Sequence, residues 1–236
     1  MLKYLFLLAA AATIGFFALK YFTGQSGLHP VKKAKPGQIR VACVGDSITY
    51  GHGTAPWPLR TYPARLQKYL GSRYCVNNFG FNGKTVNPDC GDAYTATGVY
   101  TASLNFKADI VVFMMGTNDA KPRNWRGEET FRQDLETILA RYSGARLVLC
   151  TPAAAFYEDG VTQGLACYDI CPETVQTAAR LIREVARERN CELVDIRALT
   201  ADKPQWYIAD GIHPGNTGAD AIACAIAGQI LRREEV

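Results

Sequence analysis

Short apolar runs that alternate with amphipathic stretches are the feature of this sequence that most restricts its fold. The five predicted strands are 39–44, 75–79, 109–115, 146–151 and 191–196. The predicted helices are about 61–70, 127–142, 172–189 and 217–232. This alternation of strand and helix predicts a parallel sheet with helices on both faces. We expect an α/β fold, a three-layer α/β/α sandwich whose five-stranded sheet has the order 2-1-3-4-5, because right-handed crossovers leave few other arrangements.

Residues 1–23 precede this pattern as a unit of their own. An uncharged, mostly apolar stretch runs from Tyr4 to Leu19, and a bilayer span needs about 20 such residues, a length reached if Lys20 extends to the interface. The segment is predicted to be a membrane anchor or a signal segment that is cleaved, and a buried helix is the third alternative. Residues 24–37 are interpreted as a linker and residues 38–236 as the folded domain.

The charge of the chain is concentrated near its start. Residues 1–35 hold five lysines and no acid, so 21 basic residues remain against 22 acidic ones in the whole chain. A domain so close to neutral gives no electrostatic reason to expect nucleic-acid binding. We expect a membrane-anchored or exported protein of a bacterial cell envelope, with membrane contact through the N-terminal segment and no inferred protein partner. Lys32, Lys33 and Lys35 follow that segment and would favour the cytoplasmic side, so its orientation stays open.

The sequence contains eight cysteines, which could form disulfide bonds in an oxidising compartment or bind a metal. In an exported domain, Cys75 could pair with Cys90 and Cys167 with Cys171. No C-x-x-C pair with a nearby histidine completes a zinc site, so the sequence predicts no metal.

A serine and a histidine carry the predicted chemistry. Of the three histidines, only His52 and His213 lie in the predicted domain. His213 follows Asp210 by three residues, and such a carboxylate can hold the imidazole in the tautomer that a serine hydrolase needs. Ser47 comes directly after the first strand, behind Gly45 and an aspartate, where a tight turn would present its hydroxyl at the edge of the sheet. A surface turn and a helix cap are the alternative interpretations of the two loops.

Four short blocks, taken in order, resemble those of the SGNH (GDSL-type) hydrolase family over most of residues 39–230. The blocks are Gly45-Asp46-Ser47, Asn78-Phe79-Gly80-Phe81-Asn82-Gly83, Gly116-Thr117-Asn118-Asp119 and Asp210-x-x-His213. The resemblance implies a flavodoxin-like fold and ester hydrolysis without a metal or cofactor. One residue departs from the family pattern: Ile48 follows the serine where the family usually has leucine.

The same resemblance implies roles for individual residues. Ser47 would be the nucleophile, His213 the base and Asp210 the acid that orients it. The oxyanion hole would use the N–H groups of Ser47 and Gly80 together with the side chain of Asn118. Losing one such donor typically lowers the rate by about 10²–10³-fold.

Three other functions fit the sequence less well. The segment from Asn78 to Thr85 approaches a phosphate-binding loop, but an asparagine stands at its first position and no helix follows. The G-x-S-x-G turn of α/β-hydrolases is absent from the sequence. A non-catalytic glycan-binding domain would be favoured by loss of a site residue, and none is lost.

The expected substrate is a small-molecule or glycan ester. Residues 116–125 resemble the carbohydrate acetylesterase-like bacterial members of the family, and the blocks offer no long apolar channel. We therefore expect a serine esterase that removes short acyl groups, acetyl above all, from carbohydrate through an acyl-enzyme intermediate. A lysophospholipase or thioesterase acting on longer acyl chains is the alternative. Trp125, and after it Trp57, are candidate platforms for a sugar ring, with ordinary packing as the other interpretation.

Overall fold

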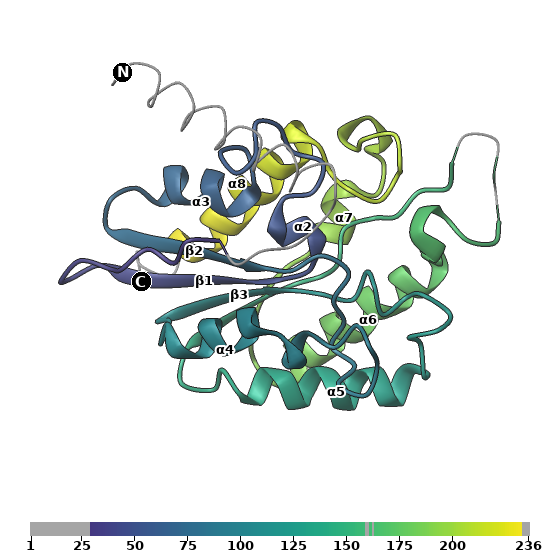
Figure 1. Ribbon diagram of the computed structural model, residues 1–236, viewed down its shortest axis with the longest axis horizontal. Helices are drawn as coiled ribbons and strands as arrows, with labels where there is room; N and C mark the ends of the chain where they lie inside the picture. Colours follow the sequence, from purple (N-terminus) through teal and green to yellow (C-terminus); the bar gives the residue numbers. More distant parts are fainter. Residues whose placement is uncertain (1–28, 159–160, 162, 233–236) are drawn as a thin grey trace, which may run out of the picture.

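A five-stranded parallel sheet in the order β2-β1-β3-β4-β5 forms the middle layer of the protein (Figure 1). The computed structural model describes residues 29–158, 161 and 163–232. The strands are β1 (Ile39–Gly45), β2 (Tyr74–Gly80), β3 (Ile110–Met114), β4 (Arg146–Cys150) and β5 (Glu192–Val194). All four pairings between neighbouring strands are parallel. The predicted sheet, including its strand order, is therefore confirmed.

Side chains alternate between the two faces of each central strand. Val41 and Cys43 of β1 pack in the cluster on one face, whereas Ala42 and Val44 pack in the cluster on the other. All four are fully buried. Because both faces are covered, a central strand of this kind is apolar at every position, and this made it recognisable in the sequence.

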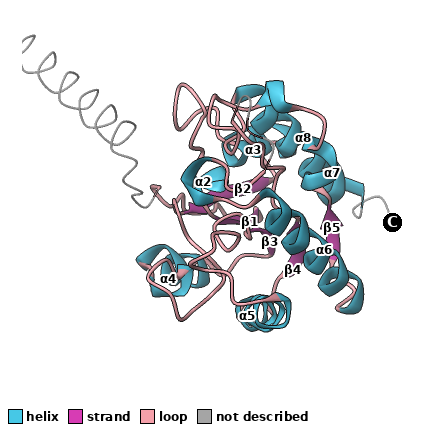
Figure 2. Ribbon diagram, turned by 90° about the vertical axis from the view of Figure 1, so that its right-hand side faces the viewer, coloured by secondary structure: helices cyan, strands magenta, loops and turns pink. Residues whose placement is uncertain are grey.

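Helices cover both faces of the sheet (Figure 2). One layer contains α2 (Ser47–Tyr50), α3 (Tyr62–Leu70), α7 (Ile196–Thr200) and α8 (Asn216–Arg232). The other contains α4 (Gly98–Asn105), α5 (Glu128–Ala140) and α6 (Pro172–Glu188). Short 3₁₀ helices lie in the loops: η1 (Tyr94–Ala96), η2 (Cys167–Asp169) and η3 (Pro204–Trp206). The four predicted helices are present as α3, α5, α6 and α8.

Three α-helices, α2, α4 and α7, were not predicted, and local capping explains each of them; Asp46 caps α2. The Asp195 carboxylate accepts a hydrogen bond from the backbone N–H of Ala198 at 3.1 Å, so α7 begins within the predicted strand 191–196 and β5 ends at Val194. The Thr97 hydroxyl caps α4 in the same way, accepting from Tyr100 N–H at 3.1 Å. Such caps satisfy N–H groups that a helix start leaves without partners.

The carboxyl ends of β2, β1 and β3 lie side by side at one edge of the sheet. Gly45, near the end of β1, pairs with Gly80 of β2 on one side and with Met114 of β3 on the other. The loops that follow these strands therefore open beside one another. In doubly wound sheets this is the edge where ligands bind.

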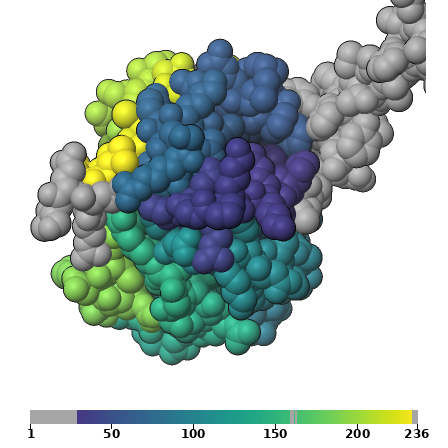
Figure 3. All heavy atoms as spheres, turned by 90° about the vertical axis from the view of Figure 1, so that its left-hand side faces the viewer, coloured from purple at the N-terminus to yellow at the C-terminus, as the bar shows by residue number. Residues whose placement is uncertain are grey.

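Part of the segment interpreted as a linker contacts the domain. Backbone N–H and C=O of Lys32 pair with the side-chain amide of Asn77 in β2 at 2.7 and 3.0 Å, and buried His29 lies 3.2 Å from the Tyr50 carbonyl oxygen. In Figure 3 the purple start of the described chain lies between the blue and the teal segments.

The predicted anchor or signal segment, residues 1–23, lies outside the described residues. Within the described part of the chain, no helix has the length and apolar character that crossing a membrane requires. All eight cysteines are described, and all are free thiols, including Cys75, Cys90, Cys167 and Cys171.

Candidate active site

Ser47 stands at the start of α2, one residue beyond the aspartate that caps this helix. Asp46 accepts a hydrogen bond from Ile48 N–H at 2.9 Å. The turn before it requires glycine at position 45, because a Cβ there would lie 2.1 Å from Thr49 Oγ1 and 2.4 Å from the Met114 carbonyl oxygen. Strand β1 can therefore turn directly into α2, and Ser47 is placed at the carboxyl edge of the sheet.

His213 and Asp210 reach this serine from the loop before α8. His213 Nε2 lies 2.8 Å from Ser47 Oγ, and its Nδ1 lies 2.7 Å from an Asp210 carboxylate oxygen. The other Asp210 oxygen accepts the backbone N–H groups of Ile212 and His213, both at 2.9 Å. The three side chains thus have the connectivity of a Ser-His-Asp triad.

The environment of Asp210 keeps its carboxylate charged. Burial raises its pKa, but the hydrogen bond and charge of His213 and the two backbone N–H donors outweigh burial and hold the pKa below its ordinary value. An ionised Asp210 fixes the tautomer of His213, so that Nε2 is free to accept the serine proton. The sequence-predicted trio is therefore brought together in a geometry suited to nucleophilic attack.

His52, the other histidine of the domain, does not contact Ser47 but packs beside the triad. Its ring centroid lies 4.3 Å from that of His213 at an interplanar angle of 55°. Burial lowers the pKa of His52, and the neighbouring His213 lowers it further. Gly53 permits this approach, because a Cβ there would lie 3.2 Å from His213 Cβ.

Gly80 does not occupy the position that the sequence assigned to it. Its N–H donates to Asn78 Oδ1 at 2.8 Å, and Gly80 is not among the residues that line the cavity beside Ser47. Gly83, three residues later, does line that cavity, and its N–H has no acceptor within the described part of the chain. Gly83 replaces Gly80 as the candidate backbone donor. Gly80 instead allows close packing, because a Cβ there would lie 2.1 Å from Tyr50 N.

Asn118 lies where the sequence predicted, at the cavity beside Ser47. Its side-chain amide donates to the Lys84 carbonyl oxygen at 3.3 Å, and its backbone carbonyl oxygen accepts from the side-chain amide of Asn124 at 2.9 Å. Ser47 N–H, at the first position of α2, has no carbonyl one turn earlier within its helix. Three donors from three loops are thus available near the serine: Ser47 N–H, Gly83 N–H and Asn118 Nδ2.

Two buried carboxyl groups lie beneath these loops. Burial raises the pKa of Asp119 to about 7, with a further contribution from the charge of Asp46, and burial raises the pKa of Asp46 to about 6. Asp119 Oδ1 accepts Val86 N–H at 3.0 Å, while its Oδ2 is buried without a partner in the described structure. Asp119 therefore ties the loop that carries Gly83 to the loop that carries Asn118.

The cavity beside Ser47 has a volume of about 230 Å³. It is lined by Ser47, His52, Asn82, Gly83, Thr117, Asn118, Lys121, Tyr168, Ile170, Ile212 and His213. Tyr168 packs edge-on against His213, with ring centroids 5.5 Å apart. Sequence reasoning missed Lys121 and Tyr168 because neither belongs to a predicted block position. Lys121, two residues after the third block, lies within the stretch 116–125 that resembles acetylesterase-like members of the family, whereas nothing in the sequence singled out Tyr168.

The two tryptophans proposed as sugar platforms are not among the residues that line this cavity. Trp125 packs on Phe131 at 5.5 Å between ring centroids, and Trp57 stacks on Tyr50 at 5.3 Å and donates to its carbonyl oxygen. Both are partly exposed. A role in binding would therefore require a substrate that extends beyond the cavity, and it stays a prediction.

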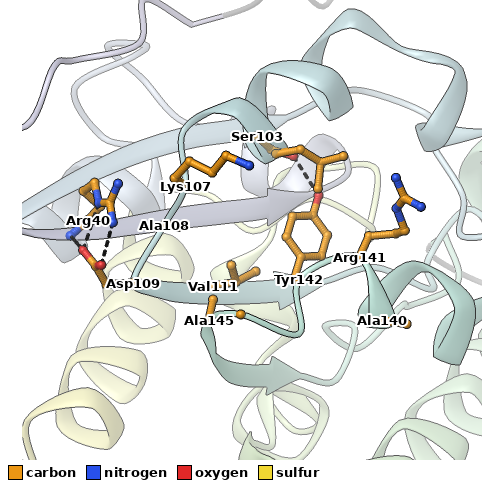
Figure 4. A pocket seen from close by; sticks show the side chains of 12 residues that line it. Arg40, Ser103, Lys107, Ala108, Asp109, Val111, Ala140, Arg141, Tyr142 and Ala145 are labelled. Carbon is orange, nitrogen blue, oxygen red and sulfur yellow. Dashed lines mark hydrogen bonds and ion pairs between the residues drawn. The ribbon is translucent and has the colours of Figure 1, made fainter.

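A larger cavity, of about 550 Å³, lies at the opposite, amino edge of the sheet (Figure 4). Four of its polar side chains form two pairs, Arg40 with Asp109 at 2.7 Å and Ser103 with Tyr142 at 2.7 Å, and Lys107 and Arg141 also line it. It holds no nucleophile–base pair among its lining residues. The chemistry therefore belongs to the smaller cavity.

One group of side chains in the described residues could hold a metal ion, namely His52, Asp210 and His213. Asp210 and both nitrogens of His213 already take part in the Ser-His-Asp connections. An ion bound there would compete with the triad, so the donor set does not suit a resident metal.

Comparisons with known proteins agree with this geometry. The GDSL-like lipase/acylhydrolase family matches residues 43–221, more than half of the chain. An acetylxylan esterase of Xylanibacter ruminicola is 33% identical over 225 residues, covering 86% of this chain and 45% of that protein. The chain thus spans about half the length of this curated relative.

Solved structures share the fold at low sequence identity. A carbohydrate acetylesterase family member from Sinorhizobium meliloti has a TM-score of 0.69 at 22% identity, covering 83% of this chain and 98% of that one. The aryl esterase of M. smegmatis has a TM-score of 0.65 at 18% identity, covering 82% and 99%. Identities this low show the fold alone.

Proposed function

The chain belongs to the GDSL-like lipase/acylhydrolase family, and we propose that within it the chain removes acetyl groups from carbohydrate through an acyl-enzyme on Ser47. The family membership confirms the resemblance found in the four sequence blocks. As a carboxylic ester hydrolase, the protein needs a nucleophile, a base and donors for the oxyanion, and the site offers candidates for each.

The proposed reaction proceeds in two steps. Ser47 Oγ attacks the ester carbonyl as His213 Nε2, 2.8 Å away, accepts its proton. The negative charge on the former carbonyl oxygen is stabilised by Ser47 N–H, Gly83 N–H and Asn118 Nδ2. As the C–O bond to the sugar breaks, His213 gives its proton to the leaving sugar oxygen, which departs as a hydroxyl. A water molecule activated by the same ring then attacks the acyl-serine and releases acetate.

The size of the cavity is the observation that carries the choice of acyl group. A cavity of about 230 Å³, lined mainly by polar or small residues, favours an acetyl ester with part of a sugar over an extended acyl chain. The acetylxylan esterase of X. ruminicola supports carbohydrate as the leaving group, since it aligns with 86% of this chain.

The test is acetate release from a panel of acetylated glycans, run beside p-nitrophenyl esters of increasing chain length. We expect acetate from at least one glycan and a kcat/KM that falls from acetyl to octanoyl. Ser47→Ala is the matched control, and it should lose activity by about 10³-fold or more while keeping its Tm. A preference for octanoyl esters would instead assign the protein to lysophospholipid or thioester hydrolysis.

The proposed role of Trp125 has its own comparison. If its ring supports a longer substrate, Trp125→Ala should lower kcat/KM on an acetylated oligosaccharide more than on p-nitrophenyl acetate. Equal losses on the two substrates would indicate packing against Phe131.

A further inference from the structure

Lys121 is a buried cation at the active-site cavity that the proposed mechanism does not use. The residue is only 7% exposed, and it lines the same cavity as Ser47 and His213. In the described structure its ammonium makes no hydrogen bond and no ion pair. Burial lowers the pKa of this amine, as expected for a cation removed from water.

Among the described residues, the acids whose charges act on Lys121 are Asp92, Asp46 and Asp169, and none of them is bonded to its ammonium. Asp92 is held by Arg123 at 3.0 Å and by the Asn124 amide at 3.4 Å. Asp46 lies beneath the cavity and accepts Ile48 N–H. The cavity lining contains a lysine and two histidines but no carboxylate. The ammonium of this largely buried side chain has no bonded partner in the cavity, and an anion brought in by the substrate would pair with it.

We infer that the substrate carries a carboxylate close to its acetylated hydroxyl and that Lys121 binds this group. The substrate class is then an O-acetylated acidic glycan, one that contains a uronic acid. This inference rests on the proposed function, since it takes Ser47 to attack an ester in the same cavity. The ammonium would form a charge-assisted hydrogen bond with the carboxylate, and water excluded from the cavity strengthens such a bond.

A different role for Lys121 makes a different prediction. If its charge stabilised the oxyanion, removing the charge would slow every ester to the same extent, with or without a carboxylate. Recognition of an acid changes only the ratio between an acidic substrate and its neutral counterpart. The ratio is therefore the quantity to measure.

The experiment compares an acetylated oligosaccharide that contains a uronic acid with the same compound after its carboxyl group is reduced to the alcohol. For the unmodified protein we expect kcat/KM to be about tenfold or more higher on the acidic form, as for one charge-assisted hydrogen bond. Lys121→Met should bring the ratio close to one, and Lys121→Arg should restore part of it. Tm should not fall in Lys121→Met, because the change removes an unpaired buried charge.

Lys84→Met is the matched control, because Lys84 lies in the neighbouring loop, outside the cavity lining, and carries the same charge. It should keep the full ratio. The inference would be overturned if the unmodified protein had the same kcat/KM on the acidic and the reduced substrate. It would also be overturned if Lys121→Met lowered kcat/KM equally on both. Ser47-dependent acetate release from any acetylated glycan separates this outcome from failure of the proposed function, in which no acetylated glycan would be a substrate.

Discussion

At the scale of single residues, Asn118 tests the oxyanion hole directly. Its amide is held by only one 3.3 Å hydrogen bond to the Lys84 carbonyl oxygen, so it can turn toward a developing oxyanion. We expect Asn118→Ala to lower kcat by about 10²–10³-fold with a small change in KM, since the donor acts mainly in the transition state. Asn105→Ala, at the end of α4 and far from Ser47 in the fold, serves as the control. A change confined to KM would contradict this assignment.

Asp119 predicts how stability depends on pH. Its pKa is about 7 in the folded protein against an ordinary 3.8, so the folded state holds this proton to higher pH than the unfolded state. The stabilisation by the protonated carboxyl is complete below pH 3.8 and is lost as pH rises through 7. The asparagine side chain in Asp119→Asn does not titrate, so this variant does not lose stability in the same way as pH rises. The Tm of the variant minus the Tm of the original protein should therefore increase between pH 4 and 8, by the equivalent of at most about 4 kcal/mol. A constant difference in Tm across this range would show that Asp119 stays ionised.

At the scale of elements, the contact between β2 and α2 decides where the nucleophile lies. A Cβ on Gly80 would lie 2.1 Å from Tyr50 N and 2.6 Å from the Thr49 carbonyl carbon, both backbone atoms that cannot turn aside. Gly80→Ala should therefore displace α2 and lower both Tm and kcat, with a destabilisation of about 1–3 kcal/mol. Gly91→Ala is the control, because a Cβ there meets no atom within 4 Å. Thermal unfolding and turnover of p-nitrophenyl acetate measure the two effects, and unchanged kcat in Gly80→Ala would argue against this contact.

At the scale of the whole molecule, Lys32 joins the segment before β1 to the sheet. Removing residues 1–28 leaves the pairing of Lys32 with buried Asn77 in place, whereas removal through residue 37 deletes it. We expect the shorter deletion to keep Tm and activity and the longer one to lower Tm by several degrees. We also propose that residues 1–23 direct the chain to the cell envelope, so only the full chain should be recovered with membranes or as an exported form. Equal Tm values for the two deletions would show that residues 29–37 add nothing to stability.

The local patterns of the sequence were sufficient for the sheet, the four longer helices and the triad. Central strands buried on both faces are apolar at every position. Gly45 at the end of the first strand permits a tight turn, and this turn places Ser47 at the edge of the sheet. His213 and Asp210 are close in sequence, so their pairing needs only one loop. These features depend on neighbours along the chain, and neighbours along the chain are visible in a sequence.

Tertiary structure alone decided which side chains share the cavity. Gly80 and Gly83 are three residues apart in one loop, and only the packing of that loop on Tyr50 and Asp119 determines that Gly83 faces the serine. Lys121 and Tyr168 reach the cavity from loops far apart in sequence, and no periodicity encodes their approach. The burial and charge of a side chain depend on every element packed around it. For this reason the unpaired ammonium of Lys121, and with it the inference of an acidic substrate, emerged only from the folded chain.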